Sequence, residues 1–269
     1  MDMCGLFVVC ALFLLEQNAM ELKDFFEKNP RAALAFSGGT DSAYLLWAAV
    51  EYGARVKAYY VKSPFQPAFE LEDAKRLAAE LGAEMEIIEL DVLADERIAA
   101  NPTERCYHCK RAIFSAICKA ADRDGYETVL DGTNASDDPG DRPGMRALRE
   151  LSVRSPLREC GLTKSDVRRL SREAGLFTHD KPAYACLATR IPTGERITRE
   201  KLYTTEKAEE YLSALGFRDF RVRYMCGSAK LQLTKADMAR AVELAEEINR
   251  ELKKYYTSVL LDMEVRNEQ

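Results

Sequence analysis

One short segment, Ser37–Ser42, constrains the fold of this chain more than any other. It follows an apolar run over residues 32–36 that predicts a buried strand, and a helical stretch over residues 43–50 comes directly after it. A small-residue turn between a strand and a helix leaves unpaired backbone N–H groups at the helix N-terminus, where an anion is favoured. The two glycines of the segment let the backbone approach a phosphate, and its two terminal serines can add hydroxyl donors. The segment therefore predicts a phosphate-binding loop.

The carboxylate of Asp41 is unusual in such a loop, because it stands beside a phosphate mainly where a cation bridges the two. Asp41 is therefore a candidate Mg²⁺ ligand. The loop is not of the Walker A type, since the Gly-Lys-Ser/Thr ending is missing. It resembles the SGGxDS signature of the PP-loop ATP pyrophosphatases, which implies cleavage of ATP to AMP and pyrophosphate. The alternative interpretation is an ordinary glycine-rich turn.

Strands and helices alternate along the chain after this loop. The predicted elements are strands over 56–61, 84–90 and 128–130, and helices over 68–81, over 107–121 and from Thr163, the expected N-cap with Asp166 three residues on. This order predicts an α/β fold, a Rossmann-like parallel sheet with helices on both faces. Ligands bind such sheets at the carboxyl ends of the strands, so Ser37–Ser42, the Cys106 region and the loop Asp131–Asn134 should gather there.

The pattern changes near residue 196. A helix over 198–215, strands over 220–224 and 230–233, a long helix over 235–254 and a strand over 258–263 are expected. These elements are enough for a smaller α/β domain. We therefore predict a PP-loop domain over residues 20–195 and a C-terminal domain over residues 196–269.

Composition limits the partners of the chain. Its 269 residues carry a net charge of -5 with a pI near 5.4, which argues against a large nucleic-acid surface, because phosphate contacts depend on Lys and Arg. A hydrophobic content of 47% and a charged content of 31% are typical of a globular, cytoplasmic protein without a membrane partner.

The first nineteen residues include a nearly unbroken apolar run over 4–15. This run lacks the basic start and the cleavage site of a signal peptide, and it is too short to cross a bilayer as a helix. An amphipathic helix opens at Met20. We therefore expect residues 1–19 to be an N-terminal extension upstream of a working start at Met20.

The eight cysteines are interpreted as candidates for metal binding or sulfur chemistry, not as a disulfide scaffold. Cys106 and Cys109 form a C-x-x-C at a helix start, where the helix dipole favours the thiolate. The pair could be a redox dithiol, half of a zinc site or half of an iron–sulfur site, and the alternative is two small packing residues. Two histidines leave little room for a His-rich site.

Cys186 lies in a loop between Pro182 and Pro192, and Arg190 follows four residues later. Arg190 could lower the pKa of the thiol or hold an anionic substrate. Further along, Arg221 and Arg223 alternate on a predicted strand, which places both on one face. They suit an anionic substrate, and the alternative is two arginines that face solvent.

Several segments together resemble the LarE family of PP-loop sulfurtransferases, which make the nickel-pincer nucleotide cofactor. The segments that carry the resemblance are Ser37–Ser42, Arg105–Lys110, Asp131–Asn134, Arg142–Leu148 and Ala185–Arg190. The resemblance runs from about Met20 to the C-terminus, in the same order along the chain.

The resemblance implies a two-step reaction on pyridinium-3,5-biscarboxylic acid mononucleotide. ATP adenylates a carboxylate of this small-molecule nucleotide and releases pyrophosphate, and sulfur then displaces AMP to give a thiocarboxylate. The sulfur comes from Cys186 itself, which becomes dehydroalanine, or from a [4Fe-4S] cluster reloaded by a sulfide donor. Because all three cysteines are present, the resemblance favours the cluster-bearing branch. The resemblance also implies a symmetric homo-oligomer, since the family tends to form them.

The implied roles cover the loops and the cysteines described above. They are ATP and pyrophosphate binding by Ser37, Gly38, Gly39, Thr40, Asp41, Ser42, Gly132, Thr133 and Asn134, Mg²⁺ binding by Asp41, catalysis by Cys186 and Arg190, substrate binding by Arg221 and Arg223, and cluster binding by Cys106, Cys109 and Cys186.

Three other functions share part of this pattern. A PP-loop tRNA thiolase also combines ATP with three cysteines, but it should carry a basic surface for RNA. An ammonia-using, AMP-forming ligase would need no special cysteines. A nucleotide-binding regulator that senses iron or redox state would not release pyrophosphate.

Overall fold

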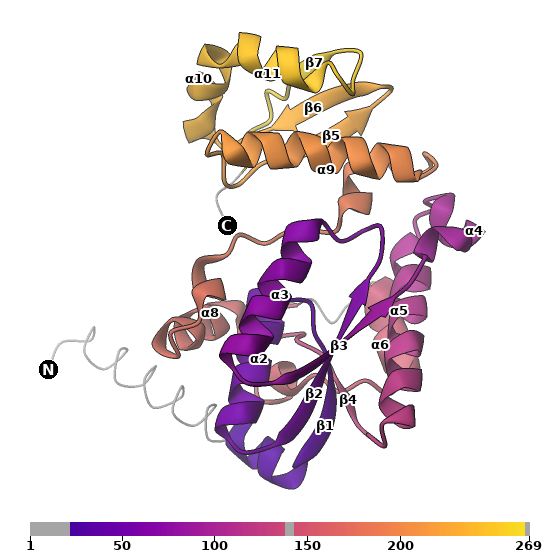
Figure 1. The fold of residues 1–269 in the computed structure, drawn as a ribbon, viewed down its shortest axis with the longest axis vertical. Helices are drawn as coiled ribbons and strands as arrows, with labels where there is room; N and C mark the ends of the chain where they lie inside the picture. The colour runs from indigo at the N-terminus through magenta and orange to yellow at the C-terminus, as the bar shows by residue number, and fades with distance from the viewer. Residues whose placement is uncertain (1–21, 138–142, 267–269) are drawn as a thin grey trace, which may run out of the picture. The chain divides into compact units, whose positions relative to one another are not determined.

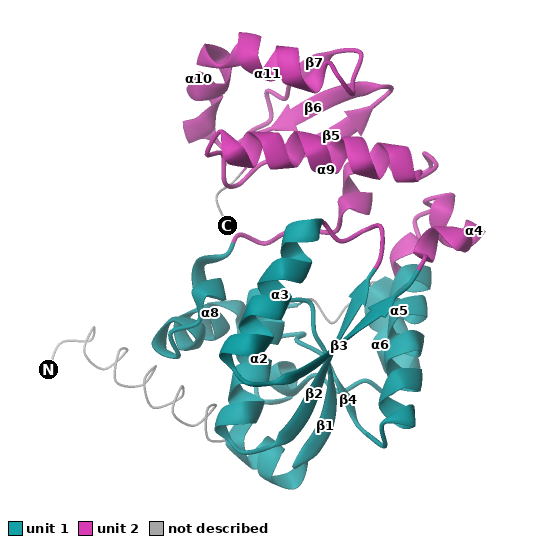
Figure 2. Ribbon diagram, in the orientation of Figure 1, with its two compact units in different colours: residues 1–62, 68–90, 107–181 teal, residues 63–67, 91–106, 182–269 magenta. Residues whose placement is uncertain are grey.

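The structure, a computed structural model, describes residues 22–137 and 143–266 (Figure 1). The chain forms two compact units, each described here by itself (Figure 2). Unit 1 comprises the chain up to Lys62, Ala68–Leu90 and Tyr107–Lys181, and unit 2 comprises Ser63–Pro67, Asp91–Cys106 and the chain from Pro182. The boundary between residues 195 and 196 stays a prediction, and the extension over 1–19 lies outside the described residues.

Unit 1 is built on a parallel sheet. Its strands are β1 (Arg31–Ala35), β2 (Arg55–Lys62), β3 (Glu84–Glu89) and β4 (Val129–Leu130), in the order β3-β2-β1-β4. All neighbouring pairs run parallel. The predicted parallel sheet is therefore confirmed, with strand bounds close to those expected.

The helices of unit 1 connect these strands. They are α2 (Thr40–Glu51), α3 (Ala68–Glu80), α5 (Arg105–Arg123, which starts in unit 2), α6 (Pro143–Glu150), α7 (Pro156–Glu159), α8 (Lys164–Glu173) and the 3-10 helix η2 (Phe177–Asp180), and residues 22–28 are also helical. The helix α8 begins at the predicted place, because Thr163 and Asp166 form a capping box.

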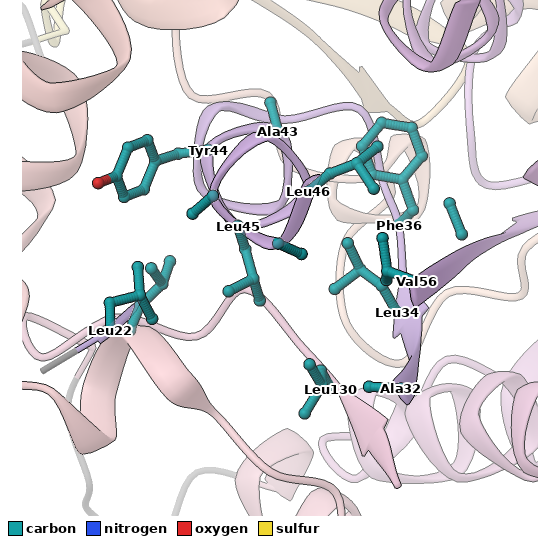
Figure 3. Packing of buried hydrophobic residues seen from close by; sticks show 14 of the residues in the cluster. Leu22, Ala32, Leu34, Phe36, Ala43, Tyr44, Leu45, Leu46, Val56 and Leu130 are labelled. Atoms are coloured by element: carbon teal, nitrogen blue, oxygen red, sulfur yellow. The ribbon is translucent and has the colours of Figure 1, made fainter. Parts of the chain in front are cut away.

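Side chains that alternate along the strands cover both faces of the sheet. Leu34 of β1 and Tyr60 of β2 join the cluster that includes Leu45 and Leu77, from α2 and α3 (Figure 3). On the other face, Tyr59 of β2 packs in a second cluster with Ile117 and Ala121 of α5 and with Ala33 and Val129 of the strands. A strand buried on both faces needs apolar residues at successive positions, as β1 has.

Strand register brings the two predicted ligand loops together. Leu34 of β1 pairs with Leu130 of β4, near the carboxyl ends of both strands. The segment Ser37–Ser42 follows β1, and the loop Asp131–Asn134 follows β4. Both loops therefore leave the same edge of the sheet from adjacent strands.

Unit 2 has a three-stranded sheet in the order β5-β6-β7, with β5 and β6 antiparallel and β6 and β7 parallel. Its elements are η1 (Val92–Ala94), α4 (Glu96–Ala99), η3 (Leu187–Arg190), α9 (Arg199–Ala214), β5 (Arg221–Met225), β6 (Ser228–Gln232), α10 (Lys235–Glu243), α11 (Ala245–Leu252) and β7 (Val259–Leu261). Helix α9 and the sheet share one core, in which Leu212, Val222 and Leu231 are buried.

The prediction of one helix over 235–254 is wrong. The chain leaves helical geometry at Leu244, where φ is -92° and ψ is 11°, and two helices result. Both helices bury residues in the same core, Ala241 from α10 and Ile248 and Leu252 from α11. Among the helices of the two described ranges, none combines the length and the apolar character needed to cross a bilayer.

A charged network ties β2 to β3 and to the end of α5. Lys57 contacts Glu86 at 2.8 Å and also Asp124, while Arg123 contacts Glu86 at 2.7 Å and Asp124 at 2.9 Å. Arg123 first, and then Lys57, hold the pKa of both carboxyl groups, Glu86 and Asp124, below their ordinary values. The folded chain therefore binds protons at these sites less readily than the unfolded chain.

This network predicts acid-sensitive stability. Because the folded-state pKa values are lowered, its contribution is complete above about pH 5 and is lost as the pH falls through about 4 and below. We expect Lys57→Met to reduce the fall in the midpoint of urea unfolding between about pH 6 and pH 3. Lys23→Met is the control, since Lys23 lies 3.8 Å from Glu27 with both side chains exposed. Identical pH dependence in both variants would contradict the prediction.

Candidate functional site

The segment Ser37–Ser42 joins β1 to α2 and leaves donors open. Gly39 is the N-cap of α2 and provides no side-chain cap. Within the described part of the chain, the N–H groups of Thr40, Asp41 and Ser42 have no hydrogen-bond partner. Three open N–H groups at the positive end of a twelve-residue helix favour an anion.

The two serines of the loop bond within the loop. The Oγ atoms of Ser37 and Ser42 lie 3.1 Å apart, and Ser42 Oγ donates to the carbonyl of Gly39 at 3.1 Å. The Ser37 N–H donates to Ser42 Oγ at 3.3 Å. The expected hydroxyl donors therefore hold the shape of the loop, and the open donors are backbone groups.

Two glycines are required by close packing around this loop. Gly38 has φ 72°, and a Cβ there would lie 3.1 Å from Ala74 Cβ. A Cβ on Gly132 would lie 2.8 Å from the backbone N of Ser42 and 3.2 Å from the carbonyl carbon of Asp41. The loop after β4 thus lies directly against the first turn of α2.

Asp41 is held from two sides. Asn134 Nδ2 donates to Asp41 Oδ1 at 3.2 Å, and Lys164 Nζ at the start of α8 forms an ion pair with Asp41 Oδ2. Nearby, Asp131 is buried and accepts hydrogen bonds from Thr133 Oγ1 and, at 2.6 Å, from Ser155 Oγ. The structure therefore brings together the predicted residues of both loops, and it adds Lys164.

The three predicted cysteines differ in their surroundings. Cys106 and Cys109 lie in the first turns of α5, Cys106 exposed and Cys109 buried. Cys186 is the N-cap of η3, and its sulfur lies 3.7 Å from Arg105 Nη1. Cys106 and Cys186 belong to unit 2 and Cys109 to unit 1. The described residues contain no group of three His, Cys, Asp or Glu side chains placed to hold a metal ion.

The backbone around Cys186 is firmly anchored. Its carbonyl accepts from the Thr189 N–H at 2.9 Å and from Thr189 Oγ1 at 2.8 Å. The next residue, Leu187, donates its N–H to the carbonyl of Phe65 at 2.9 Å. None of these bonds uses the thiol, so the sulfur can react without loss of the anchoring.

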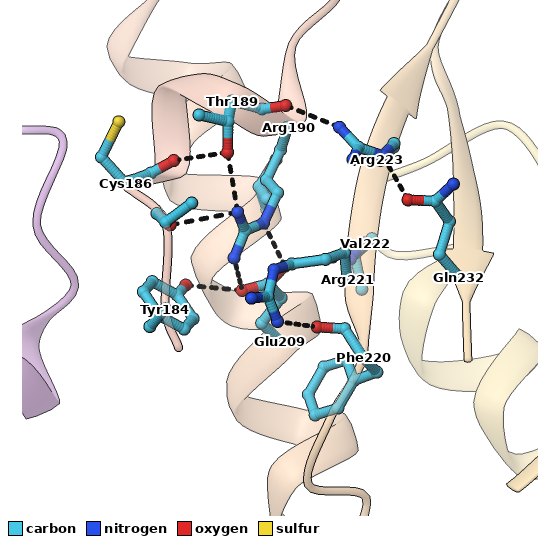
Figure 4. A network of polar contacts seen from close by, with 12 residues as sticks. Tyr184, Cys186, Thr189, Arg190, Glu209, Phe220, Arg221, Val222, Arg223 and Gln232 are labelled. Carbon is cyan, nitrogen blue, oxygen red and sulfur yellow. Dashed lines mark hydrogen bonds and ion pairs between the residues drawn. The ribbon is translucent and has the colours of Figure 1, made fainter. Parts of the chain in front are cut away.

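Arg190 lies buried in a network that has Glu209 at its centre (Figure 4). Glu209 accepts from Arg190 Nε at 2.6 Å, from the Tyr184 hydroxyl at 2.5 Å and from the Val222 N–H at 2.9 Å. Burial, the largest influence, disfavours the charged form of Arg190, but the hydrogen bond with Glu209 and the negative charge of Glu209, together with smaller contributions, outweigh it and raise the pKa. Glu209 thus joins the Cys186 loop, α9 and β5.

Arg221 and Arg223 of β5 donate to neutral oxygens, and Arg221 also forms a 3.7 Å ion pair with Asp219. Arg221 donates to the carbonyl of Phe220 at 2.6 Å, and Arg223 Nη1 donates to the carbonyl of Thr189 at 2.8 Å. Burial, and next the charge of Arg190, lower the pKa of both groups, for Arg221 to about 10. The positive charges of Arg190 and Arg266 act on both groups, which favours an anion, and Asp219 lies 3.7 Å from Arg221. The alternative of a solvent-facing arginine is wrong for Arg221, which is 7% exposed.

Sequence reasoning missed two residues of these networks. Lys164 stands at the first position of α8, where the helix dipole disfavours a cation. Glu209 is a carboxylate next to the buried Ala208 and three residues before the buried Leu212. In both cases the sequence signal was a charged residue in an unfavourable position. This signal does not identify the residue with which the charge pairs.

Comparison with known proteins places the chain among its relatives. Residues 31–103 match the family model described as queuosine biosynthesis protein QueC. The chain is 37% identical to slr1717 of Synechocystis over 231 residues, which is 86% of each protein. It is 34% identical over 236 residues to the pyridinium-3,5-bisthiocarboxylic acid mononucleotide synthase of Lactiplantibacillus plantarum, 87% of this chain and 86% of the synthase. It is 30% identical over 245 residues to MJ0830 of Methanocaldococcus jannaschii, 91% and 93% of the two chains.

Near-complete coverage at this identity, together with a parallel α/β fold that carries the phosphate-binding loop, settles the relationship. The chain belongs to the family of the pyridinium-3,5-bisthiocarboxylic acid mononucleotide synthase.

Proposed function

We propose that this chain uses ATP to convert carboxylates of pyridinium-3,5-biscarboxylic acid mononucleotide into thiocarboxylates. The observation that carries the proposal is its 34% identity, over 86% of the relative, to a synthase named for the bisthiocarboxylic acid product. A PP-loop tRNA thiolase and an ammonia-using ligase would share the loop, but the tRNA-specific 2-thiouridylase of Thermotoga maritima is only 24% identical and is matched over 56% of this chain, against 87% for the synthase.

The first step is activation of the carboxylate. A carboxylate oxygen attacks the α-phosphorus of ATP, pyrophosphate leaves, and an acyl adenylate forms. The open N–H groups of Thr40, Asp41 and Ser42 support the binding of the pyrophosphate portion. Asp41 offers the hard oxygen donors that Mg²⁺ prefers, and such an ion would neutralise charge on the leaving group.

Recognition of the substrate is assigned to Arg221 and Arg223. The substrate carries carboxylates and a phosphate, and both guanidinium groups lie near the further positive charges of Arg190 and Arg266. Glu209 pairs with Arg190 at 2.6 Å, whereas the ion pair of Arg221 with Asp219 is longer, at 3.7 Å, so an anionic substrate can compete for Arg221. Arg190 accordingly serves this site by holding the Cys186 loop to β5 through Glu209.

The second step is delivery of sulfur by Cys186. Its thiolate attacks the acyl carbon and AMP leaves, which gives a thioester. Removal of the Cα proton of Cys186 and breakage of its C–S bond then release the thiocarboxylate and leave dehydroalanine. Cys186 is partly exposed, and its sulfur lies 3.7 Å from Arg105 Nη1, so a cation stands beside the atom that would attack the acyl carbon.

A [4Fe-4S] cluster is the second route for sulfur. The thiolates of Cys106, Cys109 and Cys186 are the donor type that such a cluster takes, and it would carry an extra sulfide at the iron left without a protein ligand. No group of three potential metal ligands is found among the described residues. We therefore base no step on the cluster and leave the source of sulfur to measurement.

The test is a reaction of the purified chain with ATP, Mg²⁺ and the biscarboxylate mononucleotide. We expect AMP and pyrophosphate to form only with substrate present, together with a product in which sulfur replaces oxygen. Dehydroalanine at position 186 after turnover would identify Cys186 as the donor. Iron and sulfide in anaerobically purified protein, both lost in Cys106→Ala, would identify the cluster. AMP formation that requires tRNA or ammonia would contradict the proposal.

A further inference from the structure

A pocket in unit 2 is lined by none of the residues assigned above to ATP, to the substrate or to sulfur. It has a volume of about 710 Å³ and is lined by the first turns of α9, by β5 and by the segment that follows α11. All of its lining residues belong to unit 2, so the pocket is formed within one compact unit. Pockets for small molecules measure roughly 300–1,000 Å³, so this one admits a ligand the size of a mononucleotide.

Positive charge predominates in the lining. Lysine supplies three of the side chains, Lys201, Lys253 and Lys254, against one carboxylate, that of Glu200. The N–H group of Glu200, in the first turn of α9, has no hydrogen-bond partner among the described residues. The positive end of a sixteen-residue helix therefore adds to the charge of the lysines. In a chain with a net charge of -5, this local excess favours an anion.

Two of the three lysines pair with carboxylates that do not line the pocket. Lys201 lies 2.6 Å from Glu195, and Lys254 lies 2.6 Å from Glu251. Lys253 is exposed and forms no ion pair within the part of the chain that the structure describes. The anionic group of a ligand is therefore best placed beside Lys253 and the first turn of α9.

Tyrosine rings form the other part of the lining. Tyr224, Tyr255 and Tyr256 all contribute, and Tyr256 is buried. Lys201 Nζ already lies 4.8 Å from the centroid of the Tyr224 ring. Tyr255 is half-buried, and its ring meets that of Tyr203 edge to face, with 6.4 Å between the centroids. Tyr255 is therefore the ring against which a flat ligand can stack.

We propose that this pocket binds an aromatic mononucleotide, with its phosphate beside Lys253 and the first turn of α9 and its ring against Tyr255. A phosphate matches the positive charge, and a flat ring matches the tyrosines, so the ligand that suits the whole lining carries both. Two ligands of the proposed reaction have this chemistry, AMP and the pyridinium mononucleotide. This choice of occupants rests on the proposed function, whereas the site itself goes beyond the residues assigned to that function.

The experiment measures binding by titration calorimetry with three probes, which are AMP, nicotinic acid mononucleotide and inorganic phosphate. The full chain is first saturated with Mg²⁺ and a non-hydrolysable ATP analogue, which occupies the phosphate-binding loop. We expect at least one mononucleotide to bind, and Lys253→Glu and Tyr255→Leu each to weaken that binding about tenfold. Inorganic phosphate has no ring, so Lys253→Glu should weaken its binding and Tyr255→Leu should not.

Lys235→Glu is the matched control, because Lys235 is exposed at the start of α10 in the same unit and does not line the pocket. It makes the same change of charge as Lys253→Glu and should bind all three probes as the unchanged chain does. Circular dichroism checks the fold of each variant. If Tyr255→Leu unfolds, Lys253→Glu decides, since it changes an exposed residue.

The mononucleotide that both variants weaken identifies the occupant of the pocket. Mononucleotide binding that neither variant changes would overturn the inference, because it belongs to another site such as Arg221 and Arg223. Inorganic phosphate that binds as tightly as both mononucleotides would also overturn it, because the rings would then contribute nothing. A chain that binds a mononucleotide here but forms no thiocarboxylate would refute the proposed function and leave this inference standing.

Discussion

Replacing Gly132 with alanine is expected to abolish ATP cleavage while the chain stays folded. The added Cβ would lie 2.8 Å from the backbone N of Ser42 and 3.1 Å from its Cα, closer than van der Waals contact permits. The neighbouring atoms are backbone, so they cannot rotate away as a side chain would. Relief requires the loop after β4 to separate from the first turn of α2, which carries the open N–H groups of the phosphate site.

Such a displacement moves the open backbone N–H groups that are proposed to bind the leaving pyrophosphate. A shift approaching 1 Å in catalytic groups costs about 100-fold in rate. We therefore expect substrate-dependent pyrophosphate release to fall by at least about 100-fold in Gly132→Ala, measured with a coupled phosphate assay. Circular dichroism should show that the secondary structure remains.

Gly53→Ala is the matched control for this variant. Gly53 follows α2 with φ 75°, and no atom lies within 4 Å of a Cβ placed there. Alanine in that conformation is strained by about 1 kcal/mol, so thermal stability should fall slightly. Pyrophosphate release should stay near that of the unchanged chain. Normal release in Gly132→Ala would show that close contact between the two loops is not needed for catalysis.

Local patterns were sufficient to predict the part of the fold that positions the ATP loop. The apolar run before Ser37 and the helical spacing after Ser42 correspond to β1 and α2, and the Thr163 capping box marks the start of α8. These features depend on residues that are neighbours in the sequence. The parallel sheet follows from their alternation, because two parallel strands need a crossover between them.

The break at Leu244 was not predictable in this way. Helical spacing of apolar residues continues through it, because Ala241 before the break and Ile248 after it enter the same core. No glycine or proline stands at the break to signal it. Packing of two short helices against one small sheet overrides a continuous local preference there.

The partners of the side chains in the candidate site also could not be predicted from the sequence. Asp41 is 123 positions from Lys164, and Arg190 is 19 positions from Glu209. Each residue was visible as a charge, but its partner depends on how distant segments fold together. Arg190 was predicted as a group for the thiol or the substrate, whereas the structure places it in a buried bond with Glu209. The sequence therefore gives the charged residues, whereas the fold determines which of them form pairs.

Replacing Cys186 with alanine is expected to stop thiocarboxylate formation and to leave pyrophosphate release in place. The sulfur of Cys186 forms the new bond to carbon in the first proposed route, and its thiolate would be one of the three protein ligands of the cluster in the second. The anchors of this segment are the carbonyl of Cys186 and the N–H of Leu187, which alanine at position 186 retains. The proposed pyrophosphate contacts are backbone N–H groups of Thr40, Asp41 and Ser42, which this change does not alter.

The measurement pairs mass spectrometry of the sulfur product with pyrophosphate release in the same reaction. Cys118→Ala is the control, because burial raises the pKa of the Cys118 thiol and disfavours its thiolate. We expect Cys118→Ala to perform both steps, and Cys186→Ala to release pyrophosphate and accumulate acyl adenylate or its hydrolysis products. Continued sulfur transfer in Cys186→Ala would exclude both proposed routes. Loss of pyrophosphate release as well would mean that Cys186 takes part in activation, so that the two steps are not separable in this enzyme.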